Sequence, residues 1–165
     1  MNIRTDIRNM TRAALFAAVM VPCAWIGIRA GDFAVTMQTF AVFLALMHLG
    51  GKWGTVAILI YLLLGAVGMP VFSGFQGGFG VLLGATGGYL WGFLFSGLTY
   101  WTLEKWGKLP AAIGGLLVCY LLGTLWFAYY AGGGLAFVLL RCVVPYILPD
   151  ALKLTLAVHM AQRLK

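Results

Sequence analysis

The sequence has few charged residues. Only 9% of its 165 residues are Asp, Glu, Lys or Arg, and the whole chain holds just four carboxylates. A soluble domain carries about 25% charged residues, so this composition excludes an ordinary soluble protein. Hydrophobic residues make up 62% of the chain, and the mean hydropathy is +0.97. We therefore predict a single all-α integral membrane domain over residues 1–165, because lipid must solvate most of the apolar side chains.

Cysteine is also scarce, and a nucleotide-binding loop is missing. Cys23, Cys119 and Cys142 are widely spaced without a CxxC pair, which indicates small buried side chains and neither a disulfide nor a metal site. The segment LGGKWGT around Lys52 lacks the spacing GxxxxGK[ST] of a phosphate-binding loop, since Trp53 follows the lysine. We expect no cofactor, and no ATP hydrolysis by this chain.

Apolar runs between short turns predict about six transmembrane helices. They cover residues 11–28, 35–49, 53–67, 84–103, 110–131 and 137–163, with a turn at Gly31–Asp32 after the first. Residues 70–83 are rich in glycine, which favours an ordered or re-entrant outer loop over a helix. Gly84, Gly88 and Gly92 recur every fourth residue, a spacing that lets a second helix approach closely.

The net charge of +7 is distributed unevenly along the chain. With six spans, the two termini and the turns after residues 49 and 103 fall on one side of the membrane. That side holds eight of the eleven basic residues, namely Arg4, Arg8, Arg12, Lys52, Lys105, Lys108, Arg163 and Lys165. The positive-inside rule then places both termini in the cytoplasm. Because the basic balance reflects topology, we expect no nucleic-acid partner.

Asp150 and Lys153 are ionisable residues near the middle of the predicted helix 137–163. They are three positions apart and therefore share one helix face. Each charge costs on the order of 2.5–3.5 kcal/mol at a helix centre, so such residues usually serve a function. Pro145 and Pro149 interrupt the same helix and release backbone carbonyls nearby. We predict a small-molecule site here, and the alternative is a neutralised pair that locks the bundle.

Other candidate site residues are polar or aromatic side chains near the predicted outer ends. Gln38 lies near the outer start of the second predicted helix, where capping is an alternative role. The glycine-rich loop carries Phe75 and Gln76, and the GATGG segment carries Thr86 and Gly87, with Tyr89 just beyond it. Aromatic rings here favour stacking on a ligand ring, and the alternative is a belt at the membrane interface.

Four segments together resemble the BioY family, the biotin-binding S components of energy-coupling factor (ECF) vitamin transporters. They are VTMQTF (35–40), YLLLGAVGMPVFSGF (61–75), LLGATGGYLWGF (82–93) and PDALKLTLA (149–157). One departure is Ala85, where the family usually has proline. The resemblance implies six helices and an outward-facing biotin pocket covered by the loop before residue 84. It also implies contacts from Asp150 and Lys153 to the vitamin, whose ureido group and carboxylate suit these side chains.

The family resemblance also implies partner subunits and a prokaryotic cell membrane. S components dock small residues of their first helix onto a transmembrane coupling subunit, which two ATPase subunits drive. RAALFAAVM supplies the pairs Ala13/Ala17 and Ala14/Ala18, for which packing within this bundle is the alternative. Competing functions are an S component for thiamine or riboflavin, a small membrane enzyme acting on lipid, and a purely structural bundle. An enzyme would need clustered acids or a His–acid pair, which this sequence does not supply.

Overall fold

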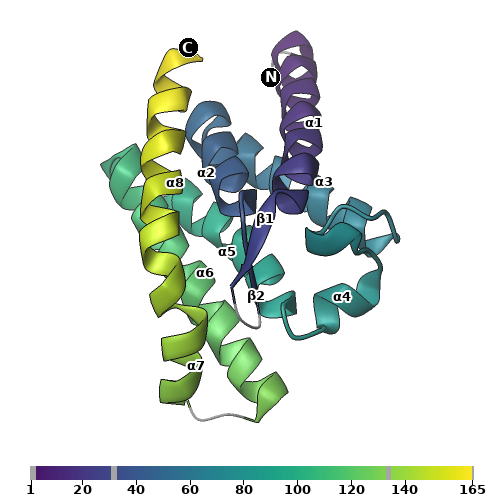
Figure 1. The fold of residues 1–165 in the computed structure, drawn as a ribbon. Coiled ribbons are helices and arrows are strands. Elements are labelled where there is room, and N and C mark those ends of the chain that lie inside the picture. Colours follow the sequence, from purple (N-terminus) through teal and green to yellow (C-terminus); the bar gives the residue numbers. More distant parts are fainter. Residues whose placement is uncertain (1–2, 31–32, 133–134, 165) are drawn as a thin grey trace.

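The protein is a bundle of helices whose two termini lie at the same end (Figure 1). The computed structural model describes residues 3–30, 33–132 and 135–164, so the predicted turn at Gly31–Asp32 and the terminal Lys165 lie outside it. Eight α-helices occur in the described residues: α1 (Ile3–Trp25), α2 (Gln38–Leu49), α3 (Gly51–Ala66), α4 (Phe79–Leu83), α5 (Gly87–Leu103), α6 (Lys108–Ala131), α7 (Leu135–Cys142) and α8 (Val144–Arg163). Short 3₁₀ turns, η1 (Ser73–Phe75) and η2 (Glu104–Trp106), precede α4 and α6.

The central helix is α2, which contacts α1, α3 and α8. Nine of its residues are buried, including every residue from Phe40 to Met47. A helix that is apolar on all sides must be covered by protein or by lipid, and the run of residues 40–47, which has no polar position, is covered here by the neighbouring helices. Around this core, α3 packs against α5, and α5 packs along α6.

A small β-hairpin between α1 and α2 corrects the prediction that the second helix begins at residue 35. β1 (Gly27–Ala30) pairs antiparallel with β2 (Phe33–Thr36), with Gly27 opposite Thr36. β2 leads into α2 through Thr36, Met37 and Gln38, with no glycine, proline or charged residue between them, so composition alone does not place this boundary. The Thr36 hydroxyl accepts the N–H of Gln38 at 3.4 Å, where the helix starts.

Other helix boundaries differ from the predictions for local reasons. α1 begins at Ile3 and includes the basic segment that precedes the apolar run, because this segment has no helix breaker. The predicted outer loop 70–83 contains η1 and α4. The last predicted helix is divided at Val143, and Pro145 occupies the first turn of α8, where a missing N–H leaves no interior bond unmade. Pro149 lies inside α8.

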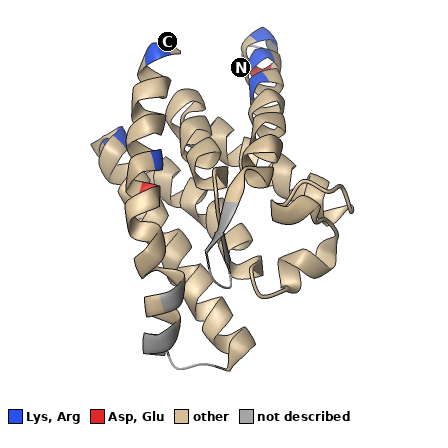
Figure 2. Ribbon diagram, in the orientation of Figure 1, with Lys and Arg blue, Asp and Glu red and all other residues tan. Residues whose placement is uncertain are grey.

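Two charged side chains form hydrogen bonds with backbone groups at helix ends, at the end of the bundle that holds both chain termini. Glu104 accepts a hydrogen bond from the first N–H of α3, at Gly51, with an Oε2–N distance of 2.7 Å. Lys108 donates to the Met47 carbonyl near the end of α2 at 2.8 Å. The basic residues coloured on the ribbon in Figure 2 gather at this end of the bundle, apart from one in the middle of α8. Each bond satisfies a backbone group that the helix itself leaves unpaired.

One helix in the described part of the chain has both the length and the apolar composition of a membrane span. This helix is α6, with 24 residues, whereas α2 and α3 are apolar but have only 12 and 16 residues. The full set of six spans therefore remains a prediction.

Glycines form the contact between α5 and α6. A Cβ at Gly88 would overlap Trp126 of α6, and one at Gly92 would press on Cys119. Gly84, the third member of the predicted series, precedes the helix, and a Cβ there would meet the backbone of Gly80 and Val81 and no atom of α6.

We expect Gly88→Ala to destabilise the protein by about 1–3 kcal/mol, as overpacked contacts do. Thermal unfolding of the purified protein in detergent, without ligand, measures this change. Gly80→Ala is the matched control, because a Cβ there meets nothing within 4 Å and alanine is the better helix former. Equal melting temperatures for wild type and Gly88→Ala would contradict the close α5–α6 contact.

Candidate functional site

A cavity of about 460 Å³ lies where α1, α2, α5 and α8 have their ends away from the chain termini. Small-molecule sites typically have volumes of about 300–1,000 Å³. The lining side chains are neutral in the part of the chain that the structure describes. The polar and aromatic ones are Trp25, Thr36, Gln38, Thr39, Phe72, Ser73, Gln76, Thr86, Tyr89, Phe93, Tyr120 and Tyr146. The cavity therefore suits a ligand with rings and several hydrogen-bonding groups.

Gln38 connects the cavity wall to α3 and to the loop after it. Its side-chain nitrogen donates to the Tyr61 hydroxyl at 3.0 Å, and that hydroxyl donates to the Val71 carbonyl at 2.9 Å. All three residues are buried. Buried polar groups that are bonded in series hold one orientation, so the Gln38 amide is fixed before any ligand arrives.

Three tryptophans fasten the segment between α3 and α5. The indole N–H of Trp25 donates to the Pro70 carbonyl at 2.9 Å, that of Trp91 to Leu82 at 3.2 Å, and that of Trp126 to Gly84 at 2.9 Å. These donors come from α1, α5 and α6. The glycine-rich segment is therefore tied to three helices along its length, which explains how a chain with so many glycines stays ordered.

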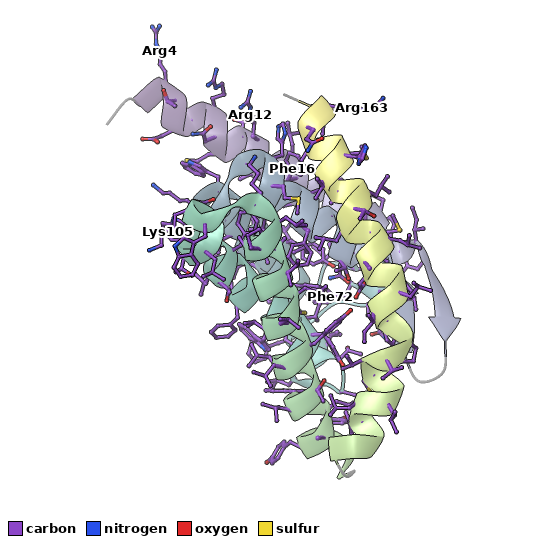
Figure 3. The ribbon with its side chains drawn as sticks, turned by 90° about the vertical axis from the view of Figure 1, so that its left-hand side faces the viewer. Arg4, Arg12, Phe16, Phe72, Lys105 and Arg163 are labelled. Carbon is purple, nitrogen blue, oxygen red and sulfur yellow. The ribbon has the colours of Figure 1, made fainter. Side chains whose placement is uncertain are left out.

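Phe72 forms an apolar part of the cavity wall in the centre of the bundle (Figure 3). It is 2% exposed, and its ring meets the Tyr61 ring edge-on at a centroid distance of 5.6 Å. A Cβ at Gly65 would overlap the Phe72 ring, so glycine on α3 makes the space for it. The Phe72 N–H bonds the Gln76 carbonyl at 2.9 Å, which closes the turn that brings Ser73 and Gln76 to the cavity.

Asp150 and Lys153 form a buried ion pair on α8. Lys153 Nζ lies 2.7 Å from Asp150 Oδ1, and the two residues are 8% and 4% exposed. The other carboxylate oxygen, Oδ2, accepts a hydrogen bond from the Tyr120 hydroxyl at 2.6 Å. Both carboxylate oxygens are thus bonded, which is the condition under which a buried charge is tolerated. Neither charged residue is among those that line the cavity, whereas Tyr120 is.

The sequence profile of the BioY family matches residues 1–165. The chain belongs to the BioY family. The probable biotin transporter BioY of Pyrococcus horikoshii is 41% identical over 160 residues, which is 96% of each chain. The biotin transporter BioY of Thermotoga maritima is 38% identical over 164 residues, again 96% of each.

A solved structure is similar over nearly the whole fold. The crystal structure of the S-component for biotin from an ECF-type ABC transporter has a TM-score of 0.90 and 26% sequence identity. The match covers 99% of this chain and 94% of the other. The two chains therefore share one helical architecture, and the family resemblance of the sequence is confirmed.

The structure places the predicted site residues of this BioY chain in four positions. Gln38, Gln76, Thr86 and Tyr89 line the cavity, and Asp150 and Lys153 lie behind it. Phe75 is 65% exposed and stacks on Trp25 with a ring-centroid distance of 4.7 Å. Gly87 is buried at the first position of α5, close against the Leu82 carbonyl, and is not among the lining residues.

Several lining residues were not predicted from the sequence. Trp25 lies at the end of α1, Tyr120 in the middle of α6 and Tyr146 at the start of α8. Each is one aromatic residue within a long apolar run, where nothing local distinguishes a site residue from a core residue.

The four alanines of the predicted docking face divide between two sides of α1. Ala13 and Ala17 are 0% and 1% exposed inside the bundle. Ala14 and Ala18 are exposed. Residues four apart share one helix face and adjacent residues do not, so a partner can reach only the second pair in this structure.

Proposed function

We propose that this chain is the substrate-binding subunit of an ECF-type transporter, which captures biotin for ATP-driven uptake. The family, the relatives named as biotin transporters and the likeness to the S-component for biotin support this function. The observation that carries it is the neutral cavity of about 460 Å³ backed by the Asp150–Lys153 pair, on a fold with a TM-score of 0.90 to that S-component.

The cavity chemistry is consistent with biotin as the ligand. Biotin has an apolar bicyclic ring and chain, a ureido group with two N–H donors and one carbonyl, and a carboxylate. Phe72 and Phe93 supply apolar wall, and Gln38 and Gln76 can both donate and accept. We propose Asp150, Lys153, Thr86, Gln38, Gln76 and Tyr89 as substrate-binding residues, with Gly87 and Phe75 shaping the wall indirectly.

The proposed topology spans the cell membrane of a prokaryote several times, with both termini in the cytoplasm. The basic residues gathered at the end with both termini (Figure 2) support this orientation through the positive-inside rule. The cavity then opens at the opposite, outer end. Figure 3 shows α1 extending past the other helices with Arg4 and Arg12 on its projecting part.

The proposed partners are a transmembrane coupling subunit and two ATPase subunits. The sequence has no phosphate-binding loop, so the energy for uptake must arrive through a protein contact. Ala14 and Ala18 on the exposed side of α1 are the residues we propose for that contact, because small side chains allow close helix–helix approach in lipid.

We expect biotin to raise the melting temperature of the detergent-purified protein, and thiamine and riboflavin to leave it unchanged. A ligand that binds only the native state stabilises it by about 2.7 kcal/mol at a hundred times Kd. A thermal-shift series with increasing concentrations of each vitamin measures this. Stabilisation by thiamine or riboflavin without stabilisation by biotin would assign the chain to another vitamin.

A further inference from the structure

Tyr61 is a buried residue of α3 that contacts two parts of the cavity wall without lining the cavity itself. Its side chain is 0% exposed, and it is not among the residues around the cavity. Its hydroxyl lies 3.0 Å from Gln38 Nε2 and 2.9 Å from the Val71 carbonyl oxygen, and its ring meets the Phe72 ring edge-on. One side chain therefore joins the start of α2 to the loop after α3.

The number of protons at the Tyr61 hydroxyl determines how the Gln38 amide is turned. The Val71 carbonyl can only accept a hydrogen bond, so the hydroxyl gives its single proton to that oxygen. The hydroxyl oxygen must then accept from Gln38, which requires the NH2 group of the amide on that side. In the reverse orientation, the amide oxygen would face a hydroxyl oxygen that has no proton left to donate. Tyr61 thus selects one of the two amide orientations.

We propose that Tyr61 is a positioning residue for biotin binding, which acts through Gln38 by holding its amide in this single orientation. A side chain that is fixed in advance loses less freedom when the ligand binds, and a turned amide would exchange the donor and the acceptor that it offers to the cavity. The orientation also depends on the loop, because the Val71 carbonyl takes the hydroxyl proton. This inference rests on the proposed function, in which Gln38 is a substrate-binding residue and the ligand is biotin.

The test is a double-mutant cycle between residues 38 and 61, in which the Kd for labelled biotin is measured with purified protein. Tyr61→Phe removes only the hydroxyl and should weaken binding about three- to tenfold, because the freed amide samples both orientations. Gln38→Met keeps the length of the side chain without its hydrogen-bonding groups and should weaken binding about ten- to a hundredfold. On the Gln38→Met background, Tyr61→Phe should change Kd by less than about twofold, because the group that Tyr61 orients is gone.

Melting temperatures without ligand separate positioning from support of the fold. Tyr61→Phe should lower them on both backgrounds, because the Val71 carbonyl loses its donor in each. The control is Tyr100→Phe on α5, the same substitution at another tyrosine that is 0% exposed. The Tyr100 hydroxyl has no hydrogen-bond partner among the described residues, and Tyr100 does not line the cavity. This variant should bind biotin with the wild-type affinity.

Two results would overturn the proposal. An equal loss of affinity for Tyr61→Phe on both backgrounds would mean that the hydroxyl only supports the fold. Unchanged affinity for Tyr61→Phe on the wild-type background would mean that the orientation of the Gln38 amide does not matter to the ligand. A wild-type protein that binds no biotin in the same assay would reject the proposed function and this inference together, whereas either of the first two results, with wild-type binding intact, rejects this inference alone.

Discussion

Lys153→Ala is expected to weaken biotin binding by about 2–5 kcal/mol, a factor of about 30 to several thousand in Kd. Among the described residues, Asp150 has two side-chain partners, and this substitution leaves it buried with only the Tyr120 hydroxyl.

Asp150→Asn should weaken biotin binding by a similar amount, because it leaves the Lys153 ammonium buried without a counter-charge. Equilibrium binding of labelled biotin to the purified variants measures both losses.

Each single substitution also lowers the free energy of unfolding. A second comparison must therefore separate the loss of stability from the loss of biotin affinity. The double variant Asp150→Leu/Lys153→Met replaces the pair with apolar side chains of similar volume, a change that is often neutral or stabilising for buried pairs. We expect this double variant to regain the wild-type melting temperature without regaining biotin binding. Should binding return together with stability, the pair only locks the bundle.

The control for these variants is Thr155→Val on the same helix. Thr155 is exposed, and among the described residues its hydroxyl bonds only carbonyls of its own helix, at 2.8 and 3.1 Å. This change should leave the affinity for biotin unchanged. A loss at Thr155 comparable to that at Lys153 would indicate that α8 responds to any substitution, and the ion pair would then have no special role.

The ion pair could be predicted from the sequence because its two residues are neighbours on one helix. Spacing alone places residues 150 and 153 on the same face, and their cost in an apolar run marks them as unusual. Tyr120 could not be predicted in the same way. Its partner lies thirty positions later on another helix, so the contact depends on how α6 packs against α8.

Helix positions were clearer in the sequence than helix ends. Apolar runs locate α3 and α6 to within two residues at each end, because glycine or charge interrupts the runs there. The β-hairpin was missed because residues 33–36 are as apolar as the start of a helix. The glycine series every fourth residue indicated the α5–α6 contact through Gly88 and Gly92, but Gly84 falls before the helix begins.

The alanines of α1 illustrate a further limit of the sequence. Ala13/Ala17 and Ala14/Ala18 have the same spacing, and no local signal says which pair faces the bundle. The packing of α1 against α2 and α3 decides this, and it buries the first pair. The central position of α2 was not available from composition either, since α3 and α6 are equally apolar and lipid can cover a helix that is apolar on every side.

Ala14→Trp or Ala18→Trp is expected to abolish biotin uptake in cells that carry the full transporter, while the isolated protein keeps its affinity for biotin. Both alanines are exposed on α1, and neither lines the cavity. A bulky side chain holds two helices apart and removes dispersion contacts along their interface. Overpacked contacts lose about 1–3 kcal/mol, which corresponds to a roughly five- to 150-fold weaker association with the coupling subunit.

Two control variants show whether an effect of Ala14→Trp arises from packing within the bundle or from contact with the coupling subunit. Ala17→Trp on the buried side of α1, where the residue is 1% exposed, should lower binding and uptake together, because it overpacks the bundle itself. Leu117→Trp on α6, where the leucine is 61% exposed, should lower neither. If Ala14→Trp behaves like Ala17→Trp, these alanines serve the fold. If it behaves like Leu117→Trp, the coupling subunit docks elsewhere. Only a loss of uptake with intact binding identifies this side of α1 as the surface through which energy reaches the transporter.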